Sequence, residues 1–305
     1  MAEGRFDVVV IGEGITGLTA ARYAARRGRV TATFEALLFG GLIINVNELD
    51  GVPPELHGSG TDLASNVMME NSELGVASNN EAVTAIARDG DAYAVVTDNG
   101  RYQARSIVIA SGARLKRLGV PGEAELENRG VSQCADCDGP MLQGAAAVVV
   151  GGSDSALQEA LVLAGFCKEV HLVHRGAKFR ARQHLIDAVA SRANIKPVFN
   201  TVVERVLGSD GVSGASTRNV SNGTTAEIPC MGFFAYVGLE PNSAFVPAEI
   251  KRDAEGRIVT DTHFATALAG VFAAGAVRAG YAGMITDAMR EGESAAAAAD
   301  AWLNR

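Results

Sequence analysis

Cysteine and basic residues are scarce in this sequence, and each scarcity excludes a class of protein. Only four cysteines occur in 305 residues, too few for a fold that is held together by disulfides. Lysine and arginine total 27, against 35 aspartates and glutamates. The resulting net charge of −8 argues against nucleic acid or an anionic membrane as a partner, because both bind basic surfaces.

Long apolar runs are missing as well. No stretch of the sequence approaches the roughly 20 apolar residues that span a bilayer. Neither a basic segment nor a long apolar one precedes the strand-like run 6–11, so we expect no secretory signal. The expected location is cytoplasmic, and the chain is long enough for two domains of ordinary size.

Glycine, by contrast, is abundant, with 35 residues in the chain. The run 6–11 leads into Gly12-Glu13-Gly14-Ile15-Thr16-Gly17, and helical spacing follows over residues 18–27. A second strand-like run, 30–34, ends at Glu35. This order indicates the βαβ unit of a dinucleotide-binding fold, with an acidic residue about 20 positions beyond the turn.

Each residue of this first turn has a physical role in nucleotide binding. Gly12 would permit the tight turn, Gly14 would let backbone approach a pyrophosphate, and Gly17 would let the helix pack closely. The helix N-terminus would offer unpaired N–H groups to the phosphates. Glu35 would accept hydrogen bonds from the adenosine ribose. A glycine-rich turn without a ligand is the alternative interpretation.

A second unit repeats this order, with a strand at 145–150, a helix at 156–166 and a strand at 170–174. Its turn places Ser153 at the middle glycine position, where a Cβ would crowd a pyrophosphate. The second strand ends in a basic stretch, His174 to Arg180. Arginines there suit a 2′-phosphate on adenosine, which favours NADPH over NADH. A solvated basic edge is the alternative.

The repeated order predicts an α/β fold with two Rossmann-like nucleotide-binding domains of the three-layer ββα type. Linker-like composition occurs at 118–122 and again near 238–242. A strand and turn at 270–275 and an alanine-rich helix from about 285 to 303 follow. We therefore expect one domain to be inserted in the other. The predicted boundaries are residues 1–116 with 244–305 for the discontinuous domain, and 117–243 for the inserted one.

Between the two turns lies Cys134-Ala135-Asp136-Cys137-Asp138-Gly139. Two nucleotide sites and a cysteine pair are the parts of an electron relay, in which nicotinamide delivers a hydride, flavin splits it into electrons and a disulfide receives them. Asp138 could give and take the proton as the dithiol forms and opens. Capping of a following helix is its alternative or additional role.

A structural zinc site is the main alternative for the cysteine pair. Zinc needs four ligands, and no second Cys-x-x-Cys or His-x-x-x-His is present. Cys167, His171 and His174 could complete a site only from a predicted buried strand and its surroundings. We expect no metal, and we interpret Cys167 and Cys230 as small buried apolar residues.

Together these residues resemble the low-molecular-weight thioredoxin reductases, class II of the pyridine nucleotide–disulfide oxidoreductases. The resemblance covers nearly the whole chain, and the block at 134–139 is highly specific to that family. The other segments that carry it are residues 12–17, 110–113, 118–122, 130–133, 152–156, 174–180 and 270–275.

The resemblance implies a flavin-dependent disulfide reductase with FAD on the discontinuous domain, NADPH on the inserted one, and a homodimer. Electrons would pass through FAD to Cys134–Cys137 and on to a thioredoxin-like protein or a small disulfide. Cys137 matches the cysteine nearer the flavin, Cys134 the one that attacks the partner, and Asp138 the acid–base residue. The implied FAD contacts are Gly12, Gly14, Gly17, Glu35, Gly40, Gly41, Gly112, Gly275, Ala276 and Val277, and the NADPH contacts are Gly152, Ser153, Asp154, Ser155, His174, Arg175 and Arg180.

Five positions depart from the family pattern. Losing one charged hydrogen bond costs about 1.5–3 kcal/mol, roughly ten- to hundredfold in affinity, so we expect weakened FAD binding. A dithiol oxidase or a reductase with another electron donor is one alternative function, and a non-catalytic subunit is another. The departures are Leu42 for a glutamine, Ser153 for a glycine, Gly176 for an arginine, Ala276 for the aspartate that bonds the ribityl chain, and Ala282-Gly283-Met284 where an Arg-Gln pair is expected.

Overall fold

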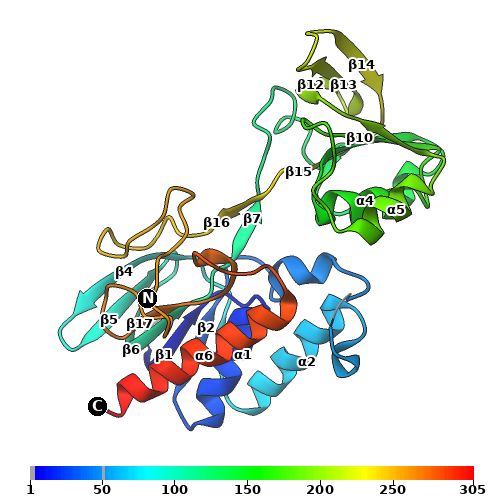
Figure 1. Cartoon of the computed structure of the whole chain (residues 1–305). Helices are drawn as coiled ribbons and strands as arrows, with labels where there is room; N and C mark the ends of the chain where they lie inside the picture. The colour runs from blue at the N-terminus through cyan, green and yellow to red at the C-terminus, as the bar shows by residue number, and fades with distance from the viewer. Residues whose placement is uncertain (1–3, 50–51) are drawn as a thin grey trace. The chain divides into compact units, whose positions relative to one another are not determined.

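The computed structural model describes residues 4–49 and 52–305. The start of the chain, where no secretory signal is expected, lies partly outside these residues. The chain divides into two compact units, Met1–Arg114 with Glu240–Arg305, and Leu115–Leu239 (Figure 1). These boundaries lie two to four residues from those that the linker composition suggested. The two connections pair with one another as short strands, β7 (Ala113–Leu115) and β16 (Leu239–Pro241).

The first unit is built on a seven-stranded sheet in the order β3-β2-β1-β6-β5-β4, with β17 also paired to β6. The strands β1, β2, β3, β6 and β17 run parallel, whereas β4 and β5 form an antiparallel extension. The strand bounds are β1 (Arg5–Ile11), β2 (Thr31–Phe34), β3 (Ala77–Asn79), β4 (Val83–Asp89), β5 (Ala92–Thr97), β6 (Arg101–Ile109) and β17 (Val271–Ala273).

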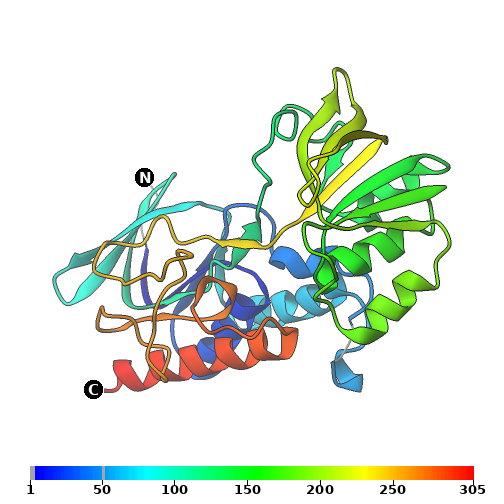
Figure 2. The ribbon, with the colours of Figure 1, turned by 45° about the horizontal axis from the view of Figure 1, so that its top comes forward.

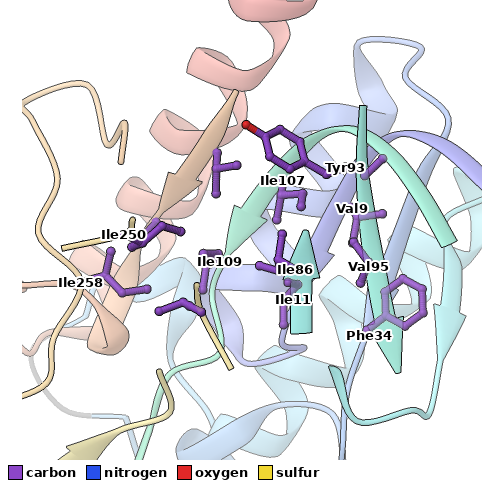
Figure 3. Packing of buried hydrophobic residues seen from close by; sticks show 14 of the residues in the cluster. Val9, Ile11, Phe34, Ile86, Tyr93, Val95, Ile107, Ile109, Ile250 and Ile258 are labelled. Carbon is purple, nitrogen blue, oxygen red and sulfur yellow. The ribbon is translucent and has the colours of Figure 1, made fainter. Parts of the chain in front are cut away.

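Its core lies mainly on the two faces of the central strands. Strands of a parallel sheet are covered on both faces and therefore read as continuous apolar runs, as Val8 to Ile11 do. Figure 3 shows one such cluster, in which Val9, Ile107 and Ile109 lie together. The unit's helices are α1 (Ile15–Arg26), α2 (Gly60–Glu73) and α6 (Ile285–Leu303), and its short 3-10 turns are η1 (Gly41–Asn45), η2 (Pro54–Leu56) and η4 (Gly275–Val277).

The alanine-rich composition of α6 has a packing cause. A Cβ added to Gly292 would lie 2.2 Å from the Thr16 carbonyl oxygen on α1, so the two helices touch at backbone distance. Ala295, Ala296 and Ala299 are fully buried in the same interface. The small side chains of α6 thus hold it against the helix that follows the first glycine turn.

The second unit has a five-stranded parallel sheet in the order β11-β10-β9-β15-β8. Alternate residues of β9 point to opposite faces. Val149 packs with Leu157 and Leu163 of α4 on one face, and Val148 packs with Val203 of an antiparallel sheet on the other. Figure 2 shows the helices on one side of the parallel sheet and the antiparallel strands on the other. This is the three-layer ββα arrangement. The bounds are β8 (Val131–Ser132), α3 (Ala135–Asp138), η3 (Gly139–Leu142), β9 (Ala146–Gly151), α4 (Asp154–Leu163), β10 (Glu169–Val173), α5 (Gln183–Ala190), β11 (Ile195–Val198), β12 (Thr201–Gly208), β13 (Val212–Asn219), β14 (Thr225–Pro229) and β15 (Gly232–Tyr236).

Local signals explain where the elements differ from expectation. The periodic run 56–75, which has the apolar spacing of a helix, becomes helical only from Gly60, because the Ser59 hydroxyl accepts a hydrogen bond from the Asp62 N–H and caps α2. Residues 54–56 form the separate turn η2. In the part of the chain that the structure describes, no helix is long and apolar enough to cross a membrane.

Candidate functional site

The first glycine turn joins β1 to α1, and two of its glycines are required by packing. Gly12 has φ 104°, and a Cβ there would lie 2.4 Å from the Ala110 carbonyl oxygen. A Cβ at Gly17 would lie 1.9 Å from the Gly12 carbonyl oxygen. These contacts close the turn and press the helix onto the strand, as the dinucleotide-binding pattern requires.

Gly14 is different, because nothing in the protein requires a glycine there. Its φ of −65° and ψ of 169° suit any residue, and an added Cβ would meet no atom nearer than 4.0 Å. No side chain caps α1, so its first N–H groups remain available. An uncapped N-terminus of a 12-residue helix beside open space fits a pyrophosphate.

Gly40 and Gly41 approach this turn from η1. The Gly40 N–H donates to the Glu13 carbonyl oxygen at 2.6 Å, and Gly40 forms a β-bridge with Gly14. Both residues have positive φ, 93° and 61°. A Cβ on Gly41 would lie 3.2 Å from the Gly14 Cα, so glycine at this position also keeps the turn accessible.

Glu35 lies at the carboxyl end of β2 and is half-buried. Its carboxylate accepts from the Glu13 N–H at 2.9 Å and from the Leu37 N–H at 3.1 Å. A carboxylate can accept about four hydrogen bonds, so acceptor sites are left for ribose hydroxyls. Glu13, which the sequence reasoning did not single out, is buried and accepts from the hydroxyls of Thr33 and Ser78.

The remaining residues expected at FAD lie at the ends of β6 and β17. Gly112 has φ 66° and open space around its Cα. Gly275, with φ 74°, begins η4 and donates its N–H to the Glu291 carboxylate at 2.8 Å. Glu291, buried on α6, also pairs with Arg278. The buried Val277 completes the turn.

The first unit therefore fits the two ends of FAD unequally. The turn, the uncapped helix and Glu35 suit the pyrophosphate and the adenosine ribose. Ala276 carries no hydrogen-bonding side chain, and neither does Met284. For a ribityl chain, Ala276 of η4 would therefore offer only its backbone groups.

The second glycine turn, between β9 and α4, is built differently. Ser153 occupies the position equivalent to Gly14, and its exposed side chain projects from the N-terminus of α4. A Cβ on Gly152 would lie 2.3 Å from the His174 ring. Asp154, followed by the exposed Ser155, accepts from the Arg182 N–H at 2.8 Å and its Nε at 2.6 Å. These bonds tie the turn to the loop after β10.

That loop carries the cations expected at a 2′-phosphate. Arg175 and Arg180 are both exposed, and neither guanidinium is in a salt bridge with another residue that the structure describes. His174 is buried beside them, and burial, followed by the charge of Arg180, lowers its pKa. Gly176 supplies no third cation. Two exposed arginines at a strand end beside a helix N-terminus fit a phosphorylated adenosine.

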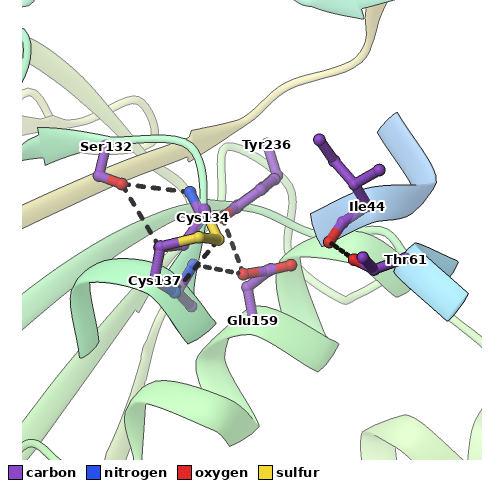
Figure 4. The surroundings of a disulfide bond; sticks show 8 residues. Ile44, Thr61, Ser132, Cys134, Cys137, Glu159 and Tyr236 are labelled. Carbon is purple, nitrogen blue, oxygen red and sulfur yellow. Dashed lines mark hydrogen bonds between the residues drawn. A yellow bond between two sulfur atoms is a disulfide. The ribbon is translucent and has the colours of Figure 1, made fainter. Parts of the chain in front are cut away.

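The cysteine pair lies on the short helix α3 of the second unit. Cys134 and Cys137 form a disulfide with Cα atoms 5.3 Å apart. The Cys137 N–H donates to the Cys134 Sγ at 3.2 Å, and the Cys134 N–H donates to the Ser132 hydroxyl at 3.1 Å (Figure 4). Cys137 is exposed and Cys134 half-buried. Such a pair can exist as a disulfide or as a dithiol.

Asp138 and Cys134 border the same cavity of about 250 Å³ within the second unit. Lys116, Arg117 and Gln133 are among its other lining residues. One cysteine of the disulfide and a carboxylic acid residue therefore line the same cavity. This placement fits the acid–base role that the resemblance implies for Asp138.

Two further residues near the disulfide were missed by the sequence reasoning. Glu159 on α4 accepts from the Ala135 N–H and from the Tyr236 hydroxyl, both at 2.9 Å (Figure 4). Burial is the main reason why the pKa of Glu159 is raised, and the negative charge of Asp136 raises it further. The three contacting residues are 24 and 77 positions apart along the chain, so no local motif points to this cluster.

The zinc alternative finds no support in the residues that the structure describes, where no three His, Cys, Asp or Glu side chains form a metal-binding group. Cys167 and Cys230 are both buried thiols. Burial raises the pKa of Cys167 and raises that of Cys230 to about 12. Thiols in this condition are poor nucleophiles and poor ligands.

Comparison with known proteins identifies the family of the chain. The family model "Pyridine nucleotide-disulphide oxidoreductase" matches residues 6–299. Thioredoxin reductase of Treponema pallidum (strain Nichols) is 34% identical over 99% of this chain and 98% of its own. The chain belongs to the thioredoxin reductases. A bifunctional thioredoxin reductase/thioredoxin of Mycobacterium leprae (strain TN) is 37% identical over 97% of this chain and 66% of its own.

Solved structures give the same family and fold. The Lactococcus lactis thioredoxin reductase matches with a TM-score of 0.94 and 35% identity, over 98% of this chain and 99% of its own. The predicted α/β fold with two Rossmann-like domains is confirmed. The protein is accordingly an oxidoreductase of the flavin-dependent disulfide reductase type, with Cys134–Cys137 as the close pair that fits a redox-active disulfide.

Proposed function

We propose that the protein is an NADPH-dependent reductase of a thioredoxin-like protein. The observation that carries the proposal is the Cys134–Cys137 disulfide, whose Cys134 lines a cavity together with Asp138 on the same unit as Arg175 and Arg180. When bound, FAD would accept a hydride from NADPH and supply two electrons to the disulfide. The contacts proposed for the two cofactors remain those named from the sequence.

The chain's own residues account for the second half of the reaction. Reduction of the Cys134–Cys137 disulfide adds two electrons and two protons and yields two thiols. Asp138 would take the Cys134 proton, and the Cys134 sulfur would attack the partner disulfide to form a mixed disulfide and release one partner thiol. Asp138 would return the Cys134 proton to the first partner sulfur as it leaves. The Cys137 sulfur would then attack the Cys134 sulfur of the mixed disulfide, its proton passing to the second partner sulfur, which leaves as a thiol and restores the intramolecular disulfide.

A protein disulfide is the preferred substrate. The Mycobacterium leprae relative carries both thioredoxin reductase and thioredoxin in its name, so a thioredoxin-like partner is the natural choice here. The experiment below also tests the alternative, in which the substrate is a small disulfide. We further infer a cytoplasmic homodimer, as the resemblance implies, and light scattering of the purified protein would measure its assembly.

The experiment measures the two half-reactions separately, first reduction of the flavin by the nicotinamide nucleotide and then reduction of the partner disulfide. The full chain, reconstituted with FAD, is mixed anaerobically with NADPH or NADH, and flavin absorbance is recorded by stopped flow. We expect bleaching with NADPH and slower bleaching with NADH. Reduction of a bacterial thioredoxin is then followed through its insulin-reducing activity, with a small aromatic disulfide for comparison.

Cys134→Ser is the variant that separates the halves. It should retain flavin bleaching by NADPH, because Arg175, Arg180 and the first turn are intact, yet reduce thioredoxin no faster than buffer. Absence of bleaching over minutes in the wild-type holoprotein would sink the proposal. Oxygen-dependent turnover of dithiols without NADPH would instead support a dithiol oxidase.

A further inference from the structure

Glu159 has no role in the reaction described so far, although it contacts the turn that carries the disulfide. Its Oε2 atom accepts from the Ala135 N–H and the Tyr236 hydroxyl. Ala135 follows Cys134 directly and is fully buried, and Tyr236 is 5% exposed. Two buried donors from α3 and β15 therefore fix one carboxylate at the base of this turn.

The charge around the turn is mostly negative. Asp136 and Asp138 lie on α3, and the charge of Asp136 adds to burial in raising the pKa of Glu159. The cations that line the cavity beside Cys134 are Lys116 and Arg117. Arg117 is paired with Glu127 at 2.6 Å, which offsets its charge. A thiolate formed on α3 would thus add a negative charge beside several carboxylates.

We propose that Glu159, held by Tyr236, is a positioning residue that keeps the reduced Cys134–Cys137 pair protonated at neutral pH. The inference rests on the proposed function, because it concerns the same dithiol. Its hydrogen bond to Ala135 anchors the turn. While it is ionised, its carboxylate would oppose ionisation of the thiols on the turn that it anchors, because nearby like charges disfavour each other's ionisation.

This arrangement has a chemical consequence. A protonated thiol is a weak nucleophile, so the reduced pair would react slowly with electrophiles that arrive without a proton acceptor. Asp138, which borders the cavity with Cys134, would remove the proton when a partner disulfide is in place. Glu159 would thus restrain the dithiol until Asp138 activates it.

The test compares the wild-type chain with Glu159→Gln. Glutamine retains an oxygen that can accept from the Ala135 N–H and the Tyr236 hydroxyl, but it carries no charge. The full chain is reduced with excess phosphine, desalted and pulsed with iodoacetamide from about pH 6 to about pH 10, the range in which thiols ionise. Peptide mass spectrometry follows Cys134 and Cys137 separately.

We expect Glu159→Gln to lower the apparent pKa of the more reactive thiol by about one unit, a roughly tenfold larger ionisation constant. Glu159→Asp, which keeps the charge, should stay closer to wild type. Tyr236→Phe removes one hydrogen bond to the carboxylate and should shift the profile in the same direction by less. Glu227→Gln, which removes an exposed carboxylate on β14, is the matched control and should change nothing.

A profile for Glu159→Gln that coincides with wild type, or moves to higher pH, overturns the proposal. Circular dichroism confirms that each variant is folded before its profile is interpreted. No NADPH or FAD-dependent step enters the assay. Failure of NADPH-driven reduction and failure of this inference are therefore separate results.

Discussion

The two glycine turns of this protein have the same βαβ setting but prepare a nucleotide site by different means. At Gly14 the backbone itself is left open, and the nearest contact of an added Cβ among the described residues is the Gly40 carbonyl oxygen at 4.0 Å. At Ser153 a side chain already occupies the equivalent place, and Arg175 and Arg180 stand exposed at the strand end. The first turn therefore favours close backbone approach, whereas the second depends more on charge.

The sharpest test of the first turn separates its packing glycine from its open one. Gly17→Ala places a Cβ 1.9 Å from the Gly12 carbonyl oxygen, so α1 must shift. We expect a loss of about 3 kcal/mol or more in the free energy of unfolding. Urea denaturation, followed by circular dichroism, measures it.

Gly14→Ala is the matched variant, with the same added methyl. Because its Cβ enters open space, the free energy of unfolding should change by about 0.5 kcal/mol or less. FAD affinity, measured by quenching of flavin fluorescence, should nevertheless fall. Equal FAD affinity in Gly14→Ala and wild type would show that the pyrophosphate does not approach there.

The charge-based second turn is tested by removing its cations. Arg175→Ala and Arg180→Ala should each raise the KM for NADPH by roughly ten- to hundredfold, since each loses a charged hydrogen bond of about 1.5–3 kcal/mol. The KM for NADH should change little, because NADH has no 2′-phosphate. Parallel increases for both nucleotides would mean that these arginines do not contact that phosphate.

Much of the fold and of the candidate site could be predicted from the sequence, because the signals for them are local. The first turn lies within six consecutive residues and the cysteine pair within four, so spacing alone indicates their chemistry. The fold class and the family followed from their order and are confirmed. The individual cofactor contacts stay predictions.

The rest depends on contacts between distant segments. Glu159 reaches Tyr236 across 77 positions and Ala135 across 24, and the sequence of its helix, with Asp154 as the other acidic residue, does not mark it out. Glu291 likewise holds η4 from 16 positions away. Neither pairing has a periodicity or a composition that sequence patterns can detect.

A gain of affinity would sharpen the contrast between the two ends of the FAD site. Ala276→Asp returns a carboxylate to η4, and we expect FAD to bind up to about tenfold more tightly through one added hydrogen bond. Ala279→Asp, a nearby change with the same added charge, serves as control. Equal dissociation constants for Ala276→Asp and the parent chain would place the ribityl chain elsewhere.

The smallest expected effect concerns the second turn. Ser153→Gly removes the Cβ at the position equivalent to Gly14, which should lower the KM for NADPH only a few-fold, because charge supplies most of the binding there. The added backbone freedom should cost about 0.5–1 kcal/mol of stability. Steady-state kinetics with NADPH and thermal unfolding measure the two. A large fall in the KM for NADPH would show that close backbone approach contributes to nucleotide binding at the second turn as it does at the first.

The packing of α6 against α1 also sets the order of events on the ribosome. The inserted unit is continuous and can fold as soon as it has emerged, whereas the discontinuous one lacks β17 and α6 until more than 240 further residues have been translated after α1, which ends at Arg26, since β17 begins only at Val271. The Gly14 turn therefore receives its supporting helix late in synthesis. In a nascent chain the inserted unit would therefore become able to bind its nucleotide first. The discontinuous unit would follow last, although its N-terminal part is translated first.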